Sequence, residues 1–223
     1  PFPEEVNRRL TDGIASLHFA PTDGARDNLL AEGYAATRIF VTGNTVVDAL
    51  LMTTAKLDRD AALTARLDAE TPYPTTGRRM ILVTGHRREN FGDGFRNICQ
   101  ALGQLAKRDD VEIVYPVHLN PNVQQPVSEI LGGIANVHLL GPLDYLAFVR
   151  LMSRAHIVIT DSGGIQEEAP SLGKPVLVMR DVTERPEAVS AGTVKLVGTD
   201  QAKIVAEAST LLDNPKAYES MSR

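Results

Sequence analysis

Apolar residues in the second part of the chain form six short runs, and helical patterns separate them. The runs are MILVTG (80–85), VEIVYPVH (111–118), NVHLLG (136–141), HIVITDS (156–162), KPVLVMR (174–180) and TVKLVG (193–198). Runs of this length bounded by Gly or Pro predict fully buried parallel strands. The helical stretch YLAFVRLM (145–152) is apolar nearly all round and should be well buried. Strands alternating with helices predict an α/β fold with a Rossmann-like doubly wound parallel sheet.

The first part of the chain has a weaker pattern. It predicts a helix in PEEVNRRL, a strand in IASLHFA, a helix in DGARDNLLAEG and a strand in RIFVTG, like the tail of another α/β unit. A long helix follows in NTVVDALLMTTAKL, with Asn44 or Thr45 as its N-cap. The Pro, Gly and Thr residues of TPYPTTGRR (71–79) then predict a turn. Both ends of the chain read as cuts through a longer protein, and the start lacks the character of a signal peptide.

Composition narrows the function classes. Among 223 residues, 23 Lys and Arg against 28 Asp and Glu give a net charge of −5, which argues against a general nucleic-acid binder. No apolar stretch is long enough for a transmembrane helix. A single cysteine, Cys99, excludes an internal disulfide and a multi-cysteine metal site, and its surroundings predict a packed thiol.

Motifs for NAD, a P-loop, a zinc protease and a nucleophile elbow are absent, so we expect neither cofactor nor metal. His18, His138 and His156 lie in or beside apolar runs and are expected to be satisfied core or edge histidines.

The most informative stretch is TDSGGIQEEAPSLGKP (160–175), which follows an apolar run and opens a helix. Ser162, Gly163 and Gly164 fall at the turn, where backbone N–H groups and the helix N-terminus favour an anion such as phosphate. A glutamate one turn later, at Glu167 or Glu168, suits hydrogen bonds from ribose hydroxyls. The alternative is a plain tight turn followed by acids that favour the helix dipole.

Three more polar clusters follow predicted strands. VTGHRRENFG (83–92) places His86, Arg87, Arg88 and Glu89 where they could grip a diphosphate; the alternative is a solvated turn with an internal Arg–Glu pair. His118 in YPVHLNPNV is either a loop-packing or a ligand residue. The last cluster, Arg180, Thr183, Glu184 and Arg185 in VMRDVTERPEAV, precedes a helix that Pro186 should open. Because parallel strands end at one edge of the sheet, all four clusters should meet there.

These stretches together, with PFPEEVNRRLT, FAPT, VTGNTVVDALL and AGTVKLVGTD, resemble the bacterial non-hydrolysing UDP-N-acetylglucosamine 2-epimerases over essentially the whole chain. The resemblance implies the C-terminal half of a GT-B-type two-domain fold. It implies interconversion of UDP-GlcNAc and UDP-ManNAc by elimination and re-addition of UDP, for bacterial surface polysaccharide synthesis. It divides the chain into residues 1–45 (tail of the catalytic domain), 46–77 (linker helix region) and 78–223 (UDP-binding domain without the final crossing helix).

The resemblance also implies roles for particular residues. Ser162, Gly163 and Gly164 match the diphosphate turn, Glu168 the ribose acid, Arg185 a nucleotide contact and His86 the cleft histidine. Phe148 lies in the stretch that holds uracil, and Leu143 stands where a family member has Gln, so a contact there would use backbone. Glu4 matches a catalytic carboxylate, and His86 is expected to share in catalysis. Arg87 is assigned to a second, activating UDP-GlcNAc site. First-domain segments that carry an Arg, a Lys, an Asp and another Glu have no counterpart here.

We therefore expect a chain that binds UDP but is inactive alone, within an isomerase that is cytoplasmic and homodimeric when complete, with no nucleic-acid or membrane partner. Three alternatives stay open at this point. A GT-B glycosyltransferase would share the fold and phosphate site but need an acceptor site. A hydrolysing epimerase would release free ManNAc and UDP. A nucleotide-sugar binding module would bind without turnover.

Overall fold

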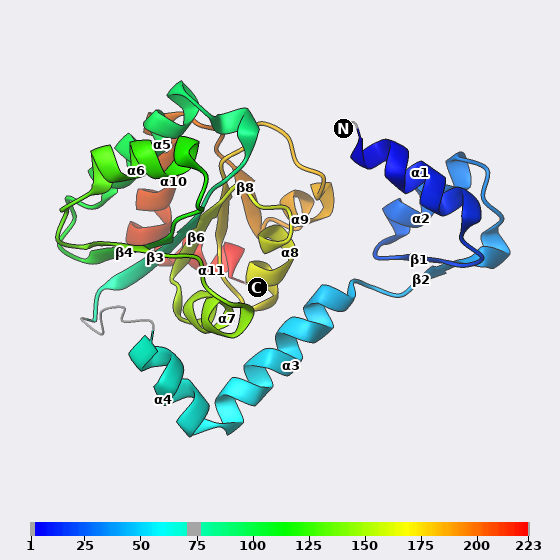
Figure 1. Ribbon diagram of the computed structural model, residues 1–223, viewed down its shortest axis with the longest axis horizontal. Coiled ribbons are helices and arrows are strands. Elements are labelled where there is room, and N and C mark those ends of the chain that lie inside the picture. Colours follow the sequence, from blue (N-terminus) through cyan, green and yellow to red (C-terminus); the bar gives the residue numbers. More distant parts are fainter. Residues whose placement is uncertain (1–2, 71–76, 223) are drawn as a thin grey trace. The chain divides into compact units, whose positions relative to one another are not determined.

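A computed structural model of the chain describes residues 3–70 and 77–222. The chain divides into two compact units, Pro1–Ala49 and Leu50–Arg223. Most of the turn expected at 71–79 lies outside the described residues. The two units can be followed along the chain by their colours in Figure 1.

The first unit contains a two-stranded parallel sheet with helices. Strands β1 (His18–Ala20) and β2 (Ile39–Val41) pair in register, and the unit also holds α1 (Glu4–Ile14), α2 (Asp23–Ala31) and the 3₁₀ turn η1 (Ala36–Arg38). Thr22 caps α2 by accepting from the amide of Ala25. The expectation of a satisfied histidine is wrong for His18: its side chain is buried, but Nε2 has no hydrogen-bond partner among the described residues. The ring instead packs on Tyr34, with centroids 4.6 Å apart, and its other nitrogen, Nδ1, lies 3.8 Å from Oδ1 of Asp12.

Helix α3 (Thr45–Arg59) begins in the first unit and continues into the second, where α4 (Ala61–Glu70) follows it. Asn44 acts as the expected cap, since its Oδ1 accepts from the amide of Val46 at 3.1 Å. Leu50, Leu57 and Leu67 are buried in a core of the second unit. The region expected to be a linker therefore contributes apolar side chains to that core.

The second unit is built on a six-stranded parallel sheet in which all six predicted strands appear. They are β3 (Arg79–Thr84), β4 (Val111–Pro116), β5 (Val137–Leu140), β6 (Ile157–Thr160), β7 (Val176–Val178) and β8 (Val194–Leu196). Their order in the sheet is β5-β4-β3-β6-β7-β8. This is the order of a doubly wound Rossmann sheet, so the expected fold class is confirmed.

Helices cover both faces of this sheet and give it two cores (Figure 1). On one face lie α5 (Asp93–Leu105), α6 (Pro121–Leu131) and α10 (Gln201–Asp213), with α11 (Pro215–Met221) after them. On the other lie α7 (Tyr145–Arg154), α8 (Ile165–Ser171) and α9 (Pro186–Ser190), together with α3 and α4. Cys99 is fully buried on α5, which confirms the packed thiol. Within the described ranges, no helix is both long and apolar enough to cross a bilayer.

Two burial predictions are wrong in part. Strands β5 and β8 are not fully buried, because each lies at an edge of the sheet. His138, Leu139 and Leu140 on β5 and Leu196 on β8 are partly exposed, and Lys195 on β8 is exposed. Helix α7 is not buried all round either. Its residues Ala147, Val149, Leu151 and Met152 enter the core, whereas Tyr145 at its first turn is 42% exposed. Helix α7 packs against β3 and α4, and residues that point away from both stay partly exposed.

Candidate functional site

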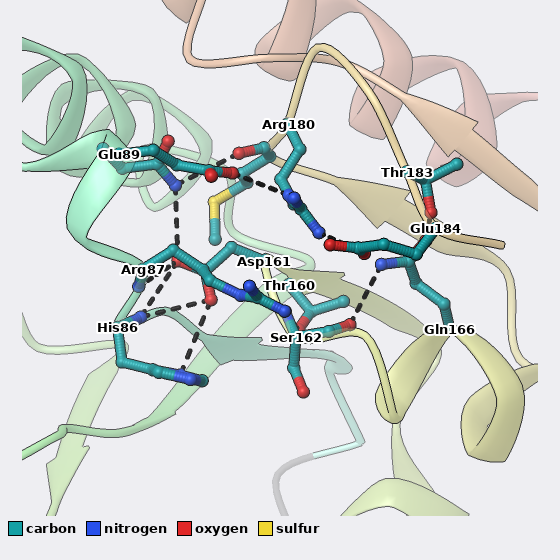
Figure 2. A network of polar contacts seen from close by, with 12 residues as sticks. His86, Arg87, Glu89, Thr160, Asp161, Ser162, Gln166, Arg180, Thr183 and Glu184 are labelled. Carbon is teal, nitrogen blue, oxygen red and sulfur yellow. Dashed lines mark hydrogen bonds and ion pairs between the residues drawn. The ribbon is translucent and has the colours of Figure 1, made fainter. Parts of the chain in front are cut away.

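The candidate site lies at the carboxyl ends of β3 and β6, the two central strands of the sheet. After β3 the chain crosses to β4 on one side, and after β6 it crosses to β7 on the other. The loops after the two strands therefore diverge, and in open α/β sheets this is where ligands bind. Thr84 and Thr160 join the two strand ends through a 2.6 Å hydrogen bond between their hydroxyls. Figure 2 shows the polar network that the neighbouring loops form there.

Asp161 is the residue on which the loop after β3 converges. It follows β6 directly and is fully buried. Its Oδ2 accepts from the amides of His86 at 2.9 Å and Arg87 at 2.8 Å, and from Nδ2 of Asn90 at 3.3 Å. The ring Nδ1 of His86 lies 3.6 Å from Oδ1 (Figure 2). One buried carboxylate thus holds the His86–Asn90 segment beside the end of β6.

The Ser162–Gly164 turn is fixed from both sides. The Ser162 amide donates to Oγ1 of Thr160 at 2.9 Å, and the Ser162 carbonyl accepts from Nε2 of Gln166 at 3.1 Å. Helix α8 starts at Ile165, immediately after the turn, as predicted. In the described part of the chain, the amides of Gly163, Gly164 and Ile165 donate to no protein acceptor. Such amides at a helix start can bind an anion.

Arg87 supplies the positive charge at this turn. A side-chain carbon added at Gly163 would lie 3.6 Å from Nη2 of Arg87 and 4.0 Å from Oε2 of Glu184. The guanidinium therefore lies beside the turn, with free amides and a cation close together. The assignment of Arg87 to a separate activating site stays a prediction, and its place in this structure is next to the proposed diphosphate turn.

Arg180 connects the loop after β3 with the loop after β7. Its buried guanidinium donates to Glu89 and to Glu184, each at 2.6 Å (Figure 2). The Arg180 hydrogen bond holds the pKa of Glu184 at about 2, well below its usual range, against the opposing effect of burial. The alternative of an internal Arg–Glu pair in HRRE is wrong: Glu89 pairs with Arg180, because the strand order brings β7 near β3.

Arg185 and Glu167 form an ion pair at the start of α9. The Arg185 Nε donates to Oε1 of Glu167, and Nη1 donates to the Glu184 carbonyl at 3.1 Å. Thr183 in the same loop donates to Oε1 of Gln166 (Figure 2). Pro186 is the first residue of α9, as predicted. These contacts hold the ERPE loop against α8 and leave the Arg185 side chain 40% exposed.

Glu168 is the buried acid of the site. It is 6% exposed, and its Oε1 accepts from the Tyr145 hydroxyl at 2.8 Å. Burial raises the pKa of Glu168, and the Tyr145 hydrogen bond acts in the opposite direction. Phe148 and Leu143, the expected uracil-side residues, are partly buried against the same core as α7. Their contacts with a base stay predictions.

His118 lies against His86. Their rings stack with centroids 5.4 Å apart and planes at 22°. The His118 Nδ1 also accepts from the amide of Asn120, which caps α6. His118 thus packs its own loop, as one of the two interpretations holds, and it also contacts the cleft histidine. Its role as a ligand residue stays a prediction.

Glu4 is not among the residues that the sheet brings together. It lies in the first turn of α1, is exposed and belongs to the first unit. Its catalytic role stays a prediction. No group of three or more His, Cys, Asp and Glu side chains in residues 3–70 and 77–222 is placed to hold a metal ion.

Sequence reasoning assigned no role to several contributors, among them Asp161, Asn90, Tyr145 and Gln166. The sequence did contain a signal for Asp161, because this acid lies directly between an apolar strand and the Ser-Gly-Gly turn, and the structure shows it buried there. Tyr145 begins an apolar helix and gave no signal of its own. Gln166 follows the turn on α8, and its partners Ser162 and Thr183 cannot be read from its neighbours in the sequence.

Comparisons with known proteins point to one family. A family model described as UDP-N-acetylglucosamine 2-epimerase matches residues 1–223. A "Probable UDP-N-acetylglucosamine 2-epimerase" from Ralstonia solanacearum is 62% identical and covers 100% of this chain, which spans 60% of that protein. The crystal structure of UDP-GlcNAc 2-epimerase from Neisseria meningitidis bound to UDP-GlcNAc superposes with a TM-score of 0.94 at 49% identity, over 100% of this chain and 60% of that one.

A more distant likeness concerns the fold alone. The C-terminal domain of a glycosyl transferase group 1 family protein from Francisella tularensis has a TM-score of 0.55 at 16% identity, covering 71% of this chain and 86% of that one. It agrees with the GT-B-type half expected from the sequence. The chain spans about 60% of the length of the curated relatives it matches. The match over every residue and the identity to these relatives lead to one conclusion: the chain belongs to the UDP-N-acetylglucosamine 2-epimerase family.

Proposed function

We propose that this chain supplies the UDP-binding half of an enzyme that interconverts UDP-GlcNAc and UDP-ManNAc. The observation that carries the proposal is the convergence of three loops, after β3, β6 and β7, on one turn with unused amides. His86, Arg87 and Ser162–Gly164 lie together there, and Glu168 lies one helical turn further on. A diphosphate beside a ribose fits this sequence of amide, cation and carboxylate groups.

In the proposed reaction, the proton on C2 of the sugar is removed and the C1–O bond to UDP breaks, giving 2-acetamidoglucal and UDP. UDP then adds back to C1 while C2 takes a proton on the opposite face. Negative charge develops on the departing diphosphate, so N–H donors that are already in place stabilise the transition state. The Ser162–Gly164 turn, His86 and Arg185 are the proposed donors. Proton transfer at C2 needs further groups, for which Glu4 is one candidate.

The binding half of the proposal is tested by calorimetric titration of the 223-residue chain with UDP. We expect saturable binding that Ser162→Trp abolishes, because the indole would fill the turn. Ser171→Trp, at the exposed opposite end of α8, is the matched control and should bind as the wild type does. Circular dichroism checks that each variant is folded. A folded wild-type chain that gives no heat with UDP would contradict the assignment of the turn.

The catalytic half is tested with a chain extended by the segments that its relatives have outside the matched region. We expect the extended protein to convert UDP-GlcNAc to UDP-ManNAc and to incorporate solvent deuterium at C2, and the 223-residue chain to show no turnover. Free ManNAc in the product would favour a hydrolysing epimerase. Turnover by the 223-residue chain would overturn the proposed division of roles.

Assembly and location are part of the same proposal. We expect a homodimer for the extended protein, measured by light scattering after size-exclusion chromatography, and a cytoplasmic location. A nucleotide-sugar binding module is the second candidate for the 223-residue chain itself. It is favoured by the fact that the crevice residues lie in the second unit while Glu4 lies in the first.

A further inference from the structure

We infer that Asp161 is the positioning residue of the site: it fixes the His86–Arg87 segment against the Ser162–Gly164 turn and so determines how tightly the diphosphate is held. The inference rests on the proposed function, because it concerns the same crevice. Asp161 directly follows β6, and the segment that it holds follows β3. It therefore acts across the point where the two central loops diverge.

The contacts of Asp161 are directed at main-chain groups. Two of its three hydrogen-bond donors are the amides of His86 and Arg87, at 2.9 and 2.8 Å from Oδ2. Hydrogen bonds to a charged acceptor are about twice as strong as neutral ones, and here the carboxylate is fully buried. Contacts to the main chain fix the direction in which both side chains leave the loop, whatever those side chains themselves contact.

The third donor extends the anchor to the next strand. Nδ2 of Asn90 donates to Asp161 at 3.3 Å and to the carbonyl of Met179 at 3.1 Å, immediately after β7. Two other guanidinium groups near the crevice are already paired: the buried Arg180 with Glu89 and Glu184, and Arg185 with Glu167. In the described residues, therefore, Asp161 has no Arg or Lys partner, and its negative charge is balanced by N–H donors of the loop.

Asp161→Asn changes this anchor while keeping its shape. The amide oxygen still accepts hydrogen bonds from the loop, but it carries no charge. The new NH₂ group is a hydrogen-bond donor, and it faces the His86 amide, which is also a donor. The loop should then loosen. Hydrogen exchange at the amides of His86 and Arg87 measures this directly in the 223-residue chain, without any ligand. We expect exchange at least about tenfold faster in Asp161→Asn, and unchanged in Asp213→Asn, the matched exposed acid.

Binding is measured with UDP and with uridine. We expect Asp161→Asn to weaken the binding of UDP about tenfold and to change the binding of uridine little, because the loop is proposed to face the diphosphate. A general loss of structure would weaken both ligands alike. The same substitution is then made in His86→Ala/Arg87→Ala. There we expect no further loss, or slightly tighter UDP, because only the removal of a nearby negative charge remains.

Each result decides one part. Unchanged amide exchange in Asp161→Asn overturns the anchoring role, and so does an equal loss for UDP and uridine. If Asp161→Asn weakens UDP binding just as much in the His86→Ala/Arg87→Ala background, Asp161 does not act through these two side chains. If the wild-type chain does not bind UDP while the amides still loosen in the variant, the anchor stands and the proposed function fails. Asp161→Ala is the second variant, with a larger effect expected in the same order.

Discussion

The hydroxyl of Tyr145, at the start of α7, donates to Oε1 of Glu168 on α8 over 2.8 Å. This hydrogen bond satisfies one oxygen of a carboxylate that the fold has buried. Burial still raises the pKa of Glu168, because a buried carboxylate loses its hydration. Ionisation of the acid that we assign to the ribose therefore has a cost to stability in the folded chain.

Glu168→Gln should stabilise the chain while weakening UDP binding. A group whose pKa is raised on folding contributes stability below its ordinary value of 4.5, and that contribution is lost as the pH rises through the folded pKa. At pH 7 we expect the variant to melt about 2–4 °C higher, as ~1 kcal/mol produces in a chain of this size. The gain should vanish below about pH 4.5. Thermal melts over a pH series measure this, and UDP titration should show weaker binding.

Tyr145→Phe is the companion variant. It removes the hydrogen bond that lowers the pKa of Glu168, so that pKa should rise further. The gain in stability that Glu168→Gln produces should then be larger in the Tyr145→Phe background than in the wild type. An equal or smaller gain would mean that the Tyr145 hydroxyl does not support the carboxylate.

Gly163→Ala should leave stability intact and impair UDP binding. An added methyl group would meet its nearest atoms at 3.6 Å, an ordinary contact, and the substitution restricts only the unfolded chain. It would, however, cover the approach to the free amides of the turn. Gly198→Ala is the contrast: Gly198 has φ +62°, and a methyl group would lie 2.7 Å from Oδ1 of Asp181. We expect a loss of about 1–3 kcal/mol there, measured by urea unfolding. If Gly163→Ala lowered the free energy of unfolding as much as Gly198→Ala does, its effect on UDP binding would not be evidence for a ligand role of Gly163.

Arg180→Met should destabilise the chain in a pH-dependent way. Glu89 and Glu184 are 49% and 47% exposed, so we expect a loss of about 2 kcal/mol at pH 7, below the cost of a fully buried pair. A pKa of about 2 for Glu184 gives stability that is present above its ordinary value of 4.5 and lost as the pH falls through about 2. The difference between wild type and variant should therefore shrink across that window.

The matched control is Arg96→Met, which breaks an exposed pair with Glu129. Its effect should stay within about 0.5 kcal/mol. Urea unfolding at several pH values measures both variants. A pH-independent loss in Arg180→Met would show that packing of the side chain, and not its charge, is what matters.

Cys99 should not react in the folded chain. Burial raises the pKa of its thiol to about 12, and the side chain has no exposed surface. We expect negligible labelling by a thiol reagent at pH 8 and complete labelling in guanidinium chloride. Labelling in native buffer faster than global unfolding would reveal a local opening of α5.

The sheet could be predicted from the sequence because each strand is a local apolar run, and residues 80–85 or 156–162 show their strands without any neighbour. Edge exposure at β5 and β8 could not, since it depends on strand order. The partners of polar residues also depend on strand order and could not be predicted. The sequence suggested that Glu89 pairs with a neighbouring arginine, yet its partner Arg180 is 91 positions away. Asp161 and the amide of His86 are 75 positions apart. Neighbouring positions in a sequence indicate only those side-chain pairs that lie within one turn of a helix or loop.

The central place of β3 also has a consequence for synthesis of the chain. Strand β4 can pair with β3 soon after it leaves the ribosome, but the other edge of β3 waits for Ile157–Thr160. Until then a row of unpaired backbone groups is exposed on a nascent chain, which invites mispairing with other chains. The crevice proposed to bind a nucleotide is correspondingly late to form, because it needs both central strands and the loop after β7.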